Sequence, residues 1–177
     1  MTAWHPTLTN RIISRIHKLN MNNDKFPSSH PCSAQKDGEA APVFHHRIPV
    51  QIRFSDVDRY GHVNNNSYFA YYDLGKEEYM SKVLNVDYRK QDVVPVIANI
   101  NADFILPIFH GDSIAVETRV SHIGNKSFTL EQQAVNTRTG QVMCKCSTIM
   151  VCFNLRTQQS AEMPAHYRKA IEDYELG

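Results

Sequence analysis

The chain has 177 residues, of which 42% are hydrophobic, and this length predicts a single domain with a short appendage. Its 19 basic and 18 acidic residues give a formal net charge of +1 at pH 7, whereas a protein that tracks nucleic-acid phosphates usually carries a clear basic excess. Runs of about 18 apolar residues are missing. We therefore expect neither a nucleic-acid partner nor a membrane span.

The N-terminal 42 residues differ in composition from the rest of the chain. Residues 1–23 contain three basic residues and no acid, a pattern that occurs in organellar targeting peptides and also in simple surface helices. Residues 20–42 are rich in Asn, Ser and Pro and have little apolar surface to bury. We expect residues 1–42 to form an extension and polar linker that can stay disordered, and residues 43–177 to form the folded domain. A cytoplasmic location is favoured, with organellar targeting as the alternative.

The folded domain is expected to begin with a strand and a long helix. Alternating apolar residues within 44–54 predict the strand, and a turn-rich stretch follows at 55–66. Residues 67–83 are predicted to be helical, because an aromatic stripe recurs at helical spacing. The stripe consists of Tyr68, Tyr72, Gly75 and Tyr79.

Gly75 is the unusual member of this stripe. Glycine lowers helix propensity by about 1 kcal/mol relative to alanine. We therefore expect another backbone to approach the helix closely at Gly75. The tyrosines around it can be plain core or can line an apolar tunnel for an acyl group, and the residues alone do not decide between these roles.

The second half of the chain is expected to consist almost entirely of strands. Segments of alternating apolar residues predict strands at 93–106, 113–123, 127–135 and 141–155. The last is long enough to curve or bulge, and a closing helix is expected after Pro164. One long helix with four or five sequential, mostly antiparallel strands indicates an α+β domain whose sheet wraps around its helix.

The cysteines do not suggest a metal site. Zinc sites usually show CxxC pairs or nearby histidines, and neither accompanies these residues. Two of the four are separated by one residue and share a face of the predicted last strand. We expect reduced thiols, as in most cytosolic proteins. The four are Cys32, Cys144, Cys146 and Cys152.

Polar chemistry is concentrated directly before the predicted helix. Asp56 and Asp58 point the same way if the strand continues that far, and they need not do so if the chain turns there. A carboxylate can act as a nucleophile or as a base for water. Residues 64–67 are helix N-cap candidates, and the N–H groups at a helix start can bind a developing oxyanion. This combination suits attack on an acyl carbonyl.

Simpler interpretations of the same loop remain open. Asp and Asn are the commonest turn residues, so the loop can be a well-capped turn without chemistry. His62 can belong to a site or can be structural. A metal site at Asp56, Asp58 and His62 is conceivable, but no further spaced ligands accompany these residues.

The segment DVDRYGHVNNNSY, residues 56–68, resembles the DxDxxGHVNNxxY signature of the 4-hydroxybenzoyl-CoA thioesterase family, the hotdog-fold acyl thioesterases. The similarity runs from about Arg47 to about Glu172 and includes HIGNKSF at 122–128. It implies a curved antiparallel sheet around one long helix. It also implies a homodimer or homotetramer with active sites at the dimer interface.

The resemblance also implies roles for individual residues. Asp58, the second acid of the signature, would be the catalytic carboxylate that attacks the thioester or activates water. The backbone N–H of Asn65, seven residues later, would polarise the thioester carbonyl. Lys126 and Ser127 would contact the nucleotide end of coenzyme A. The implied substrate-binding residues are Gly61, His62, Asn64, Tyr68, Lys126 and Ser127.

The implied function is hydrolysis of acyl-CoA or acyl-carrier-protein thioesters. No cofactor is expected, because coenzyme A is part of the substrate, and no metal is expected. One alternative is a non-catalytic protein of the same fold that binds acyl thioesters. A dehydratase or hydratase is a weaker alternative, because such relatives use motifs such as DxNPxH, and no Asn-Pro pair lies between Asp58 and His62.

Overall fold

The computed structural model describes residues 42–85, 87 and 90–176, so the predictions for residues 1–41 lie outside the described residues. The described part has the order that the sequence predicts: a strand, a long helix, a run of strands and a closing helix. In chain order the elements are strand β1 (His46–Val50), the 3-10 turn η1 (Phe54–Asp56), helix α2 (Asn65–Leu84), strands β2 (Val93–Phe104), β3 (Ile114–Ile123), β4 (Ser127–Asn136), β5 (Val142–Asn154) and β6 (Gln159–Ser160), and helix α3 (Ala165–Leu176).

Strand β1 is shorter than the predicted 44–54. The chain leaves the sheet and forms η1, in which the N–H of Asp56 donates to the carbonyl of Arg53 (3.0 Å). The Asp56 carboxylate in turn accepts the N–H of Arg53 at Oδ2 (2.8 Å). Local bonds of this kind compete with pairing in a sheet. They end the strand and begin the loop that leads into α2.

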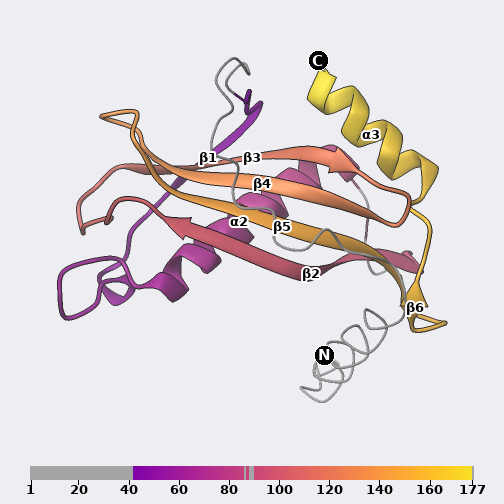
Figure 1. Cartoon of the computed structure of the whole chain (residues 1–177), viewed down its shortest axis with the longest axis horizontal. Helices are drawn as coiled ribbons and strands as arrows, with labels where there is room; N and C mark the ends of the chain where they lie inside the picture. The colour runs from indigo at the N-terminus through magenta and orange to yellow at the C-terminus, as the bar shows by residue number, and fades with distance from the viewer. Residues whose placement is uncertain (1–41, 86, 88–89, 177) are drawn as a thin grey trace.

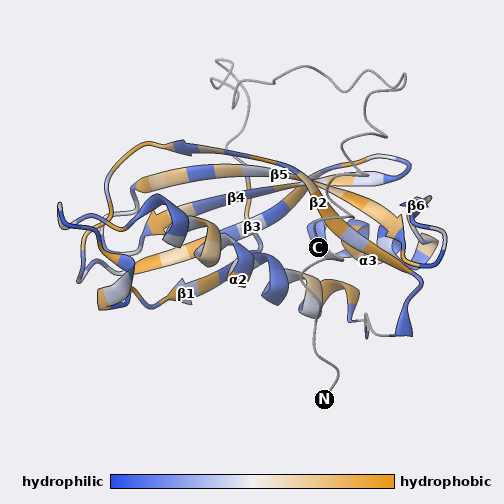
Figure 2. Ribbon diagram, turned by 90° about the horizontal axis from the view of Figure 1, so that it is seen from below, coloured by the Kyte–Doolittle hydropathy of each residue, from blue (hydrophilic) through white to orange (hydrophobic). Residues whose placement is uncertain are grey.

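All strand pairs are antiparallel, in the order β1-β3-β4-β5-β2, and β6 pairs with β5. Helix α2 lies across one face of this sheet (Figure 1), and Figure 2 shows the sheet curving around the helix. Helix α3 packs at one end against α2 and β3. The predicted α+β domain, a curved antiparallel sheet around one long helix, is confirmed.

Register shifts interrupt three of the strand pairings. One lies in the pairing of β4 with β5, beside Ala134, so the prediction that the long strand β5 bulges is confirmed. Others occur beside Val120 in the pairing of β3 with β4 and beside Ile97 in the pairing of β2 with β5. Bulges increase local twist, which helps the sheet to curve around α2.

Three cysteines lie on the inner face of β5. Cys144, Cys146 and Cys152 are buried, and they form no disulfide with one another. Cys32 lies outside the described residues. Burial raises the pKa of the Cys152 thiol to about 11, so this thiol stays protonated near neutral pH.

Gly75 marks a close approach of the sheet, although not of a backbone as predicted. A Cβ atom built on Gly75 would lie 2.6 Å from Val116 Cγ1, 3.0 Å from Gln132 Nε2 and 3.1 Å from Thr118 Oγ1. These side chains project from β3 and β4 toward α2. The Gln132 amide also donates to the carbonyl of Tyr72 (2.9 Å) and to Thr118 Oγ1 (3.1 Å). The glycine therefore lets a buried polar pair touch the helix.

Helix α3 is hydrogen-bonded to the rest of the domain through the side chain of Glu175. Its Oε1 accepts the hydroxyl of Tyr79 on α2 (2.5 Å) and the N–H of Val120 on β3 (2.7 Å). The Val120 position adjoins a register shift, where a strand N–H needs a partner from outside the sheet. The Glu175 carboxylate therefore joins helix α3 to both α2 and β3.

His46 is the buried titratable group beside this junction. Its side chain is only 4% exposed, and its ring lies edge-on to Tyr79 with centroids 5.6 Å apart. Nε2 has no hydrogen-bond partner among the residues that the structure describes. Burial, and then the charge of Lys82, lower the pKa of His46 below 6.5, and the nearby Glu78 and Glu175 do not outweigh them.

We expect His46 to make the domain sensitive to acid. Because its pKa is lowered in the folded state, the unfolded chain binds more protons below about pH 6.5, and stability is lost as the pH falls through the folded-state value. The free energy of unfolding in denaturant, measured from pH 8 to pH 5, should fall less steeply for His46→Gln than for the wild type, by up to about 1.4 kcal/mol per pH unit. His166→Gln makes the same replacement at an exposed position on α3 and controls for any effect of exchanging His for Gln that does not depend on burial. Parallel curves for wild type and His46→Gln would contradict this prediction.

Candidate active site

Residues 56–64 form a tight hairpin directly before α2. The N–H of Asn64 donates to the carbonyl of Asp56 (2.7 Å) where the two arms begin. Farther along, the N–H of Asp58 donates to the carbonyl of His62 (2.8 Å). The chain therefore turns within the motif, and the backbone of each arm is held by the other.

Asp58 lies at the turn of this hairpin and is partly buried. Its Oδ1 accepts the N–H groups of Tyr60 (2.8 Å) and His62 (3.2 Å). Gly61 adopts a φ of +81°, which side-chain-bearing residues rarely adopt, and donates its N–H to the Asp58 carbonyl (3.1 Å). No residue in the described part of the chain donates to Oδ2 of Asp58. The loop thus fixes one carboxylate oxygen with its own backbone.

Asp56 has a different role in the structure. Its Oδ2 accepts the hydroxyl of Tyr71 from the second turn of α2 (2.8 Å), in addition to the N–H of Arg53. Burial, and then the hydrogen bond to Asp56, raise the pKa of Tyr71, so its hydroxyl stays protonated and donates. The two carboxylates therefore have different partners, because Asp56 accepts donors from outside the hairpin whereas Asp58 accepts backbone N–H groups of the hairpin itself.

Helix α2 starts at Asn65 with Asn64 as its N-cap. The Asn64 side chain accepts the N–H of Asn66 (3.0 Å), which selects one residue from the predicted cap candidates. As the first helical residue, Asn65 has no carbonyl of the helix one turn earlier to accept its N–H. That N–H lies at the positive end of the helix dipole. The helix start that the sequence predicts after the acidic loop is therefore present, and the roles of Asp58 and Asn65 stay predictions.

A second loop, 105–113, packs beside the hairpin. The N–H of Val63 donates to the carbonyl of Ile108 (2.8 Å), and the ring of His62 stands edge-on to Phe109 with centroids 5.0 Å apart. No sequence motif predicts a site role for Phe109. The available signal was its position in the turn that follows a predicted strand. His62 is thereby held between the two loops.

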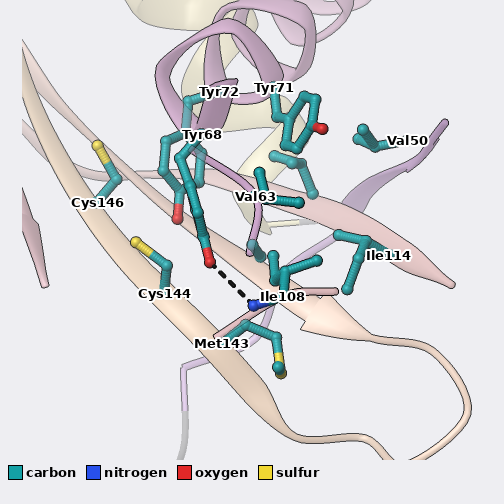
Figure 3. Close-up of a cluster of buried hydrophobic side chains, with 12 residues drawn as sticks. Val50, Val63, Tyr68, Tyr71, Tyr72, Ile108, Ile114, Met143, Cys144 and Cys146 are labelled. Atoms are coloured by element: carbon teal, nitrogen blue, oxygen red, sulfur yellow. Dashed lines mark hydrogen bonds between the residues drawn. The ribbon is translucent and has the colours of Figure 1, made fainter. Parts of the chain in front are cut away.

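Tyr68 belongs to the core beneath the hairpin. It is buried, and its hydroxyl accepts the N–H of Ile108 (3.3 Å), as the dashed line in Figure 3 shows. Its ring also stands edge-on to Phe104 of β2, with centroids 5.1 Å apart. Tyr68 thus ties the loop after β2 to the start of α2, and its contact with a substrate stays a prediction.

The structure separates Lys126 and Ser127 from the Asp58 loop within one chain. Ser127 begins β4, whereas the other end of β4, at Asn136, pairs with the start of β3. Nine strand steps separate the two ends, about 30 Å at about 3.3 Å per residue. The hairpin and the loop 105–113 lie at the Asn136 end, because the N–H of Val63 donates to the carbonyl of Ile108 and the N–H of Thr137 donates to the carbonyl of Ser113. The remaining predicted residues, from Gly61 to Tyr68, are brought together around the hairpin.

A metal centre at the hairpin is not supported by the side-chain arrangement. Within residues 42–176, apart from the undescribed residues 86, 88 and 89, no three His, Cys, Asp or Glu side chains are placed to hold a metal ion. Asp56, Asp58 and His62 are among the residues to which this applies.

The fold and this hairpin place the chain in a known family. A sequence model of the thioesterase-like superfamily matches residues 52–171, which is more than half of the chain. The chain therefore belongs to the thioesterase-like superfamily and has the hotdog fold, and the family resemblance predicted from the 56–68 motif is confirmed.

Individual relatives share most of their length with this chain. Long-chain acyl-CoA thioesterase FadM of Escherichia coli (strain K12) is 23% identical over 124 residues, which cover 70% of this chain and 94% of that protein. A thioesterase structure from Thermus thermophilus, complexed with coenzyme A and Zn, has a TM-score of 0.66 and 27% identity, covering 76% of this chain and 97% of that one. A variant of 4-hydroxybenzoyl-CoA thioesterase complexed with 4-hydroxybenzoyl-CoA has a TM-score of 0.65 and 22% identity, covering 71% and 96%.

Proposed function

We propose that this protein hydrolyses acyl-CoA thioesters to a free acid and coenzyme A, with Asp58 as the catalytic carboxylate. Thioester hydrolysis is the activity that membership of the superfamily indicates. The observation that carries the residue assignment is the partly buried Asp58, whose Oδ1 is fixed by two backbone N–H groups directly ahead of the start of α2.

The chemistry follows from the two oxygens of Asp58. With Oδ1 held, Oδ2 attacks the thioester carbon or takes a proton from a water molecule that attacks it. In the first route an O–C bond forms as the C–S bond breaks, which gives a mixed anhydride and a coenzyme A thiolate. Water then hydrolyses the anhydride. In either route the thioester oxygen gains negative charge, which the N–H of Asn65 at the positive end of α2 would stabilise.

The substrate is proposed to be an acyl group on coenzyme A, with an acyl carrier protein as the alternative carrier. The relatives named above include an acyl-CoA thioesterase and a structure with bound coenzyme A. Gly61, His62 and Asn64 would line the approach to Asp58, and Tyr68 would support it from below. No cofactor beyond the coenzyme A of the substrate is proposed.

A substrate panel tests this function. The purified protein is incubated with short-, medium- and long-chain acyl-CoAs, an aryl-CoA and the matching acyl-carrier proteins, while thiol release is followed and products are identified by mass spectrometry. Release of free acid and thiol is expected. Tight binding without thiol release would support a non-catalytic acyl-binding protein instead. A hydrated or dehydrated acyl product would support a hydratase or dehydratase.

Strand β2 suggests how copies of the chain assemble. It is an edge strand of the sheet, and its apolar residues Ile97, Ile100 and Phe104 are 40%, 40% and 45% exposed. A long edge with exposed apolar side chains readily pairs with another chain. We propose a homodimer, or a homotetramer built from dimers, through this edge. A second copy would also supply Lys126 and Ser127, which one chain keeps away from its own Asp58.

A charge on this edge is expected to disrupt assembly. Ile100→Lys should shift the protein from dimer or tetramer to monomer and lower thioester turnover, because a buried unpaired ammonium opposes pairing. Light scattering after size-exclusion chromatography measures the mass. Leu176→Lys places the same charge on an exposed leucine at the end of α3 and should leave the mass unchanged. Unchanged mass for Ile100→Lys would show that β2 is not the interface.

The described residues contain no helix that is long and apolar enough to cross a membrane. We propose a cytoplasmic location. Fractionation of cells that express the full chain tests it, and recovery of the protein in an organelle fraction would favour a targeting role for residues 1–23.

A further inference from the structure

Asp56 connects three segments around the hairpin. Its carboxylate accepts the N–H of Arg53, before the hairpin, and the hydroxyl of Tyr71 on α2, both at 2.8 Å. Its carbonyl accepts the N–H of Asn64 (2.7 Å) and the hydroxyl of Ser67 (3.3 Å), at the end of the hairpin and in the first turn of α2. Asp56 therefore links both arms of the hairpin to helix α2 by hydrogen bonds.

Tyr71 is the partner of Asp56 whose position is held by packing in the core. It is 5% exposed, and its ring belongs to the hydrophobic cluster shown in Figure 3, on the side of α2 that faces the sheet. Only its hydroxyl reaches out of that cluster, to the Asp56 carboxylate. Because the ring is packed, the hydroxyl has little freedom to move, and it places Asp56 at a defined distance from the helix axis.

We propose that Tyr71 and Asp56 are positioning residues, which set the hairpin that carries Asp58 relative to the N-terminus of α2. This inference rests on the proposed function of Asp58. Its physical basis is that the Asp58 carboxylate and the Asn65 N–H must act on the same thioester group. A misplacement of about 1 Å between such groups can lower the rate about 100-fold. Neither positioning residue touches the reacting atoms.

Tyr71→Phe removes the hydroxyl and keeps the packed ring. We expect kcat to fall at least about 10-fold with KM within about threefold of the wild type, because binding surfaces stay intact while the reacting groups lose their alignment. Hydrogen-exchange mass spectrometry should show faster exchange in a peptide that covers residues 57–63. Asp56→Asn keeps an oxygen that accepts both donors and should retain most of the activity, whereas Asp56→Ala should resemble Tyr71→Phe.

Tyr79→Phe provides the matched control. Tyr79 is another buried tyrosine of α2 whose hydroxyl donates to a carboxylate, that of Glu175 (2.5 Å), but it lies at the α3 end of the helix. This variant should lose thermal stability and keep the wild-type kcat and the wild-type exchange of residues 57–63. An equal loss of kcat in both variants would overturn the positioning role and leave only a general effect of stability.

The readouts separate this inference from the proposed function. If the wild type turns over a thioester and Tyr71→Phe keeps its kcat, the inference fails and the proposed function stands. If no thioester is turned over, the proposed function fails, and hydrogen exchange alone decides whether Tyr71 holds the hairpin. Unchanged exchange of residues 57–63 in Tyr71→Phe overturns the inference in either case. Loss of activity in Asp56→Asn equal to that in Asp56→Ala would also overturn it, because a charged catalytic role would then explain Asp56.

Discussion

Replacing Asp58 with Asn is expected to lower kcat for thioester hydrolysis at least about 100-fold, the lower range for loss of a general base. An amide neither attacks a thioester nor accepts a proton from water near neutral pH. The amide oxygen still accepts the N–H groups of Tyr60 and His62, so the hairpin should keep its shape. The thermal midpoint should therefore change little while turnover is lost. Thiol release under saturating acyl-CoA measures kcat.

Asp112→Asn is the matched control for this substitution. Asp112 is also partly buried, and its Oδ2 accepts the N–H of Phe109 (2.9 Å) in the loop beside the hairpin. The same chemical change there should leave kcat within about threefold, because a neutral amide oxygen still accepts this bond.

A second variant, Asp58→Ala, separates catalysis from binding. It removes both oxygens, so an acyl-CoA that binds but is not hydrolysed can be trapped and its affinity measured. Equal turnover by wild type and Asp58→Ala would remove Asp58 from the reaction. Under single turnover, a transient acyl adduct on Asp58 of the wild type would identify the anhydride route. Its absence, with turnover intact, would favour base-activated water.

The sequence predicts the elements of the domain because each is a local pattern. The periodicity of two in the strands and the aromatic stripe of the helix need no knowledge of distant residues. The order of strands in the sheet is different, because β1 lies beside β3 and β2 lies at the far edge. That order depends on which surfaces of the strands meet α2, so local patterns do not determine it.

In the candidate site, too, some features follow from local sequence and others depend on distant residues. The N-cap at Asn64 and the turn at Gly61 follow from local chemistry, and the motif carried both. The hydrogen bond that Asp56 accepts from Tyr71 joins residues fifteen positions apart. The spacing of the two acids alone does not predict that partner. The three-residue step from Tyr68 to Tyr71 does place Tyr71 on the buried side of the helix, and this was the available signal.

Replacing Gly75 with Ala is expected to destabilise the domain, although alanine is the better helix former by about 1 kcal/mol. The added methyl group would lie 2.6 Å from Val116 Cγ1, a fully buried branched side chain on a central strand that cannot swing away. Overpacking of a well-packed core typically costs about 1–3 kcal/mol. Unfolding in guanidinium chloride should therefore give a lower free energy for Gly75→Ala than for the wild type.

Val116→Ala shows whether this contact is the cause. Alone, it leaves a cavity and should also destabilise the domain. Combined with Gly75→Ala, it removes the methyl group that collides, so the double variant should be more stable than the two single losses predict, by at least about 1 kcal/mol. Additive losses would place the strain at Gln132 or Thr118 instead, the other two side chains within 3.1 Å of the added atom. A Gly75→Ala variant as stable as the wild type would mean that the sheet relaxes around α2, and the close approach would then not explain the glycine.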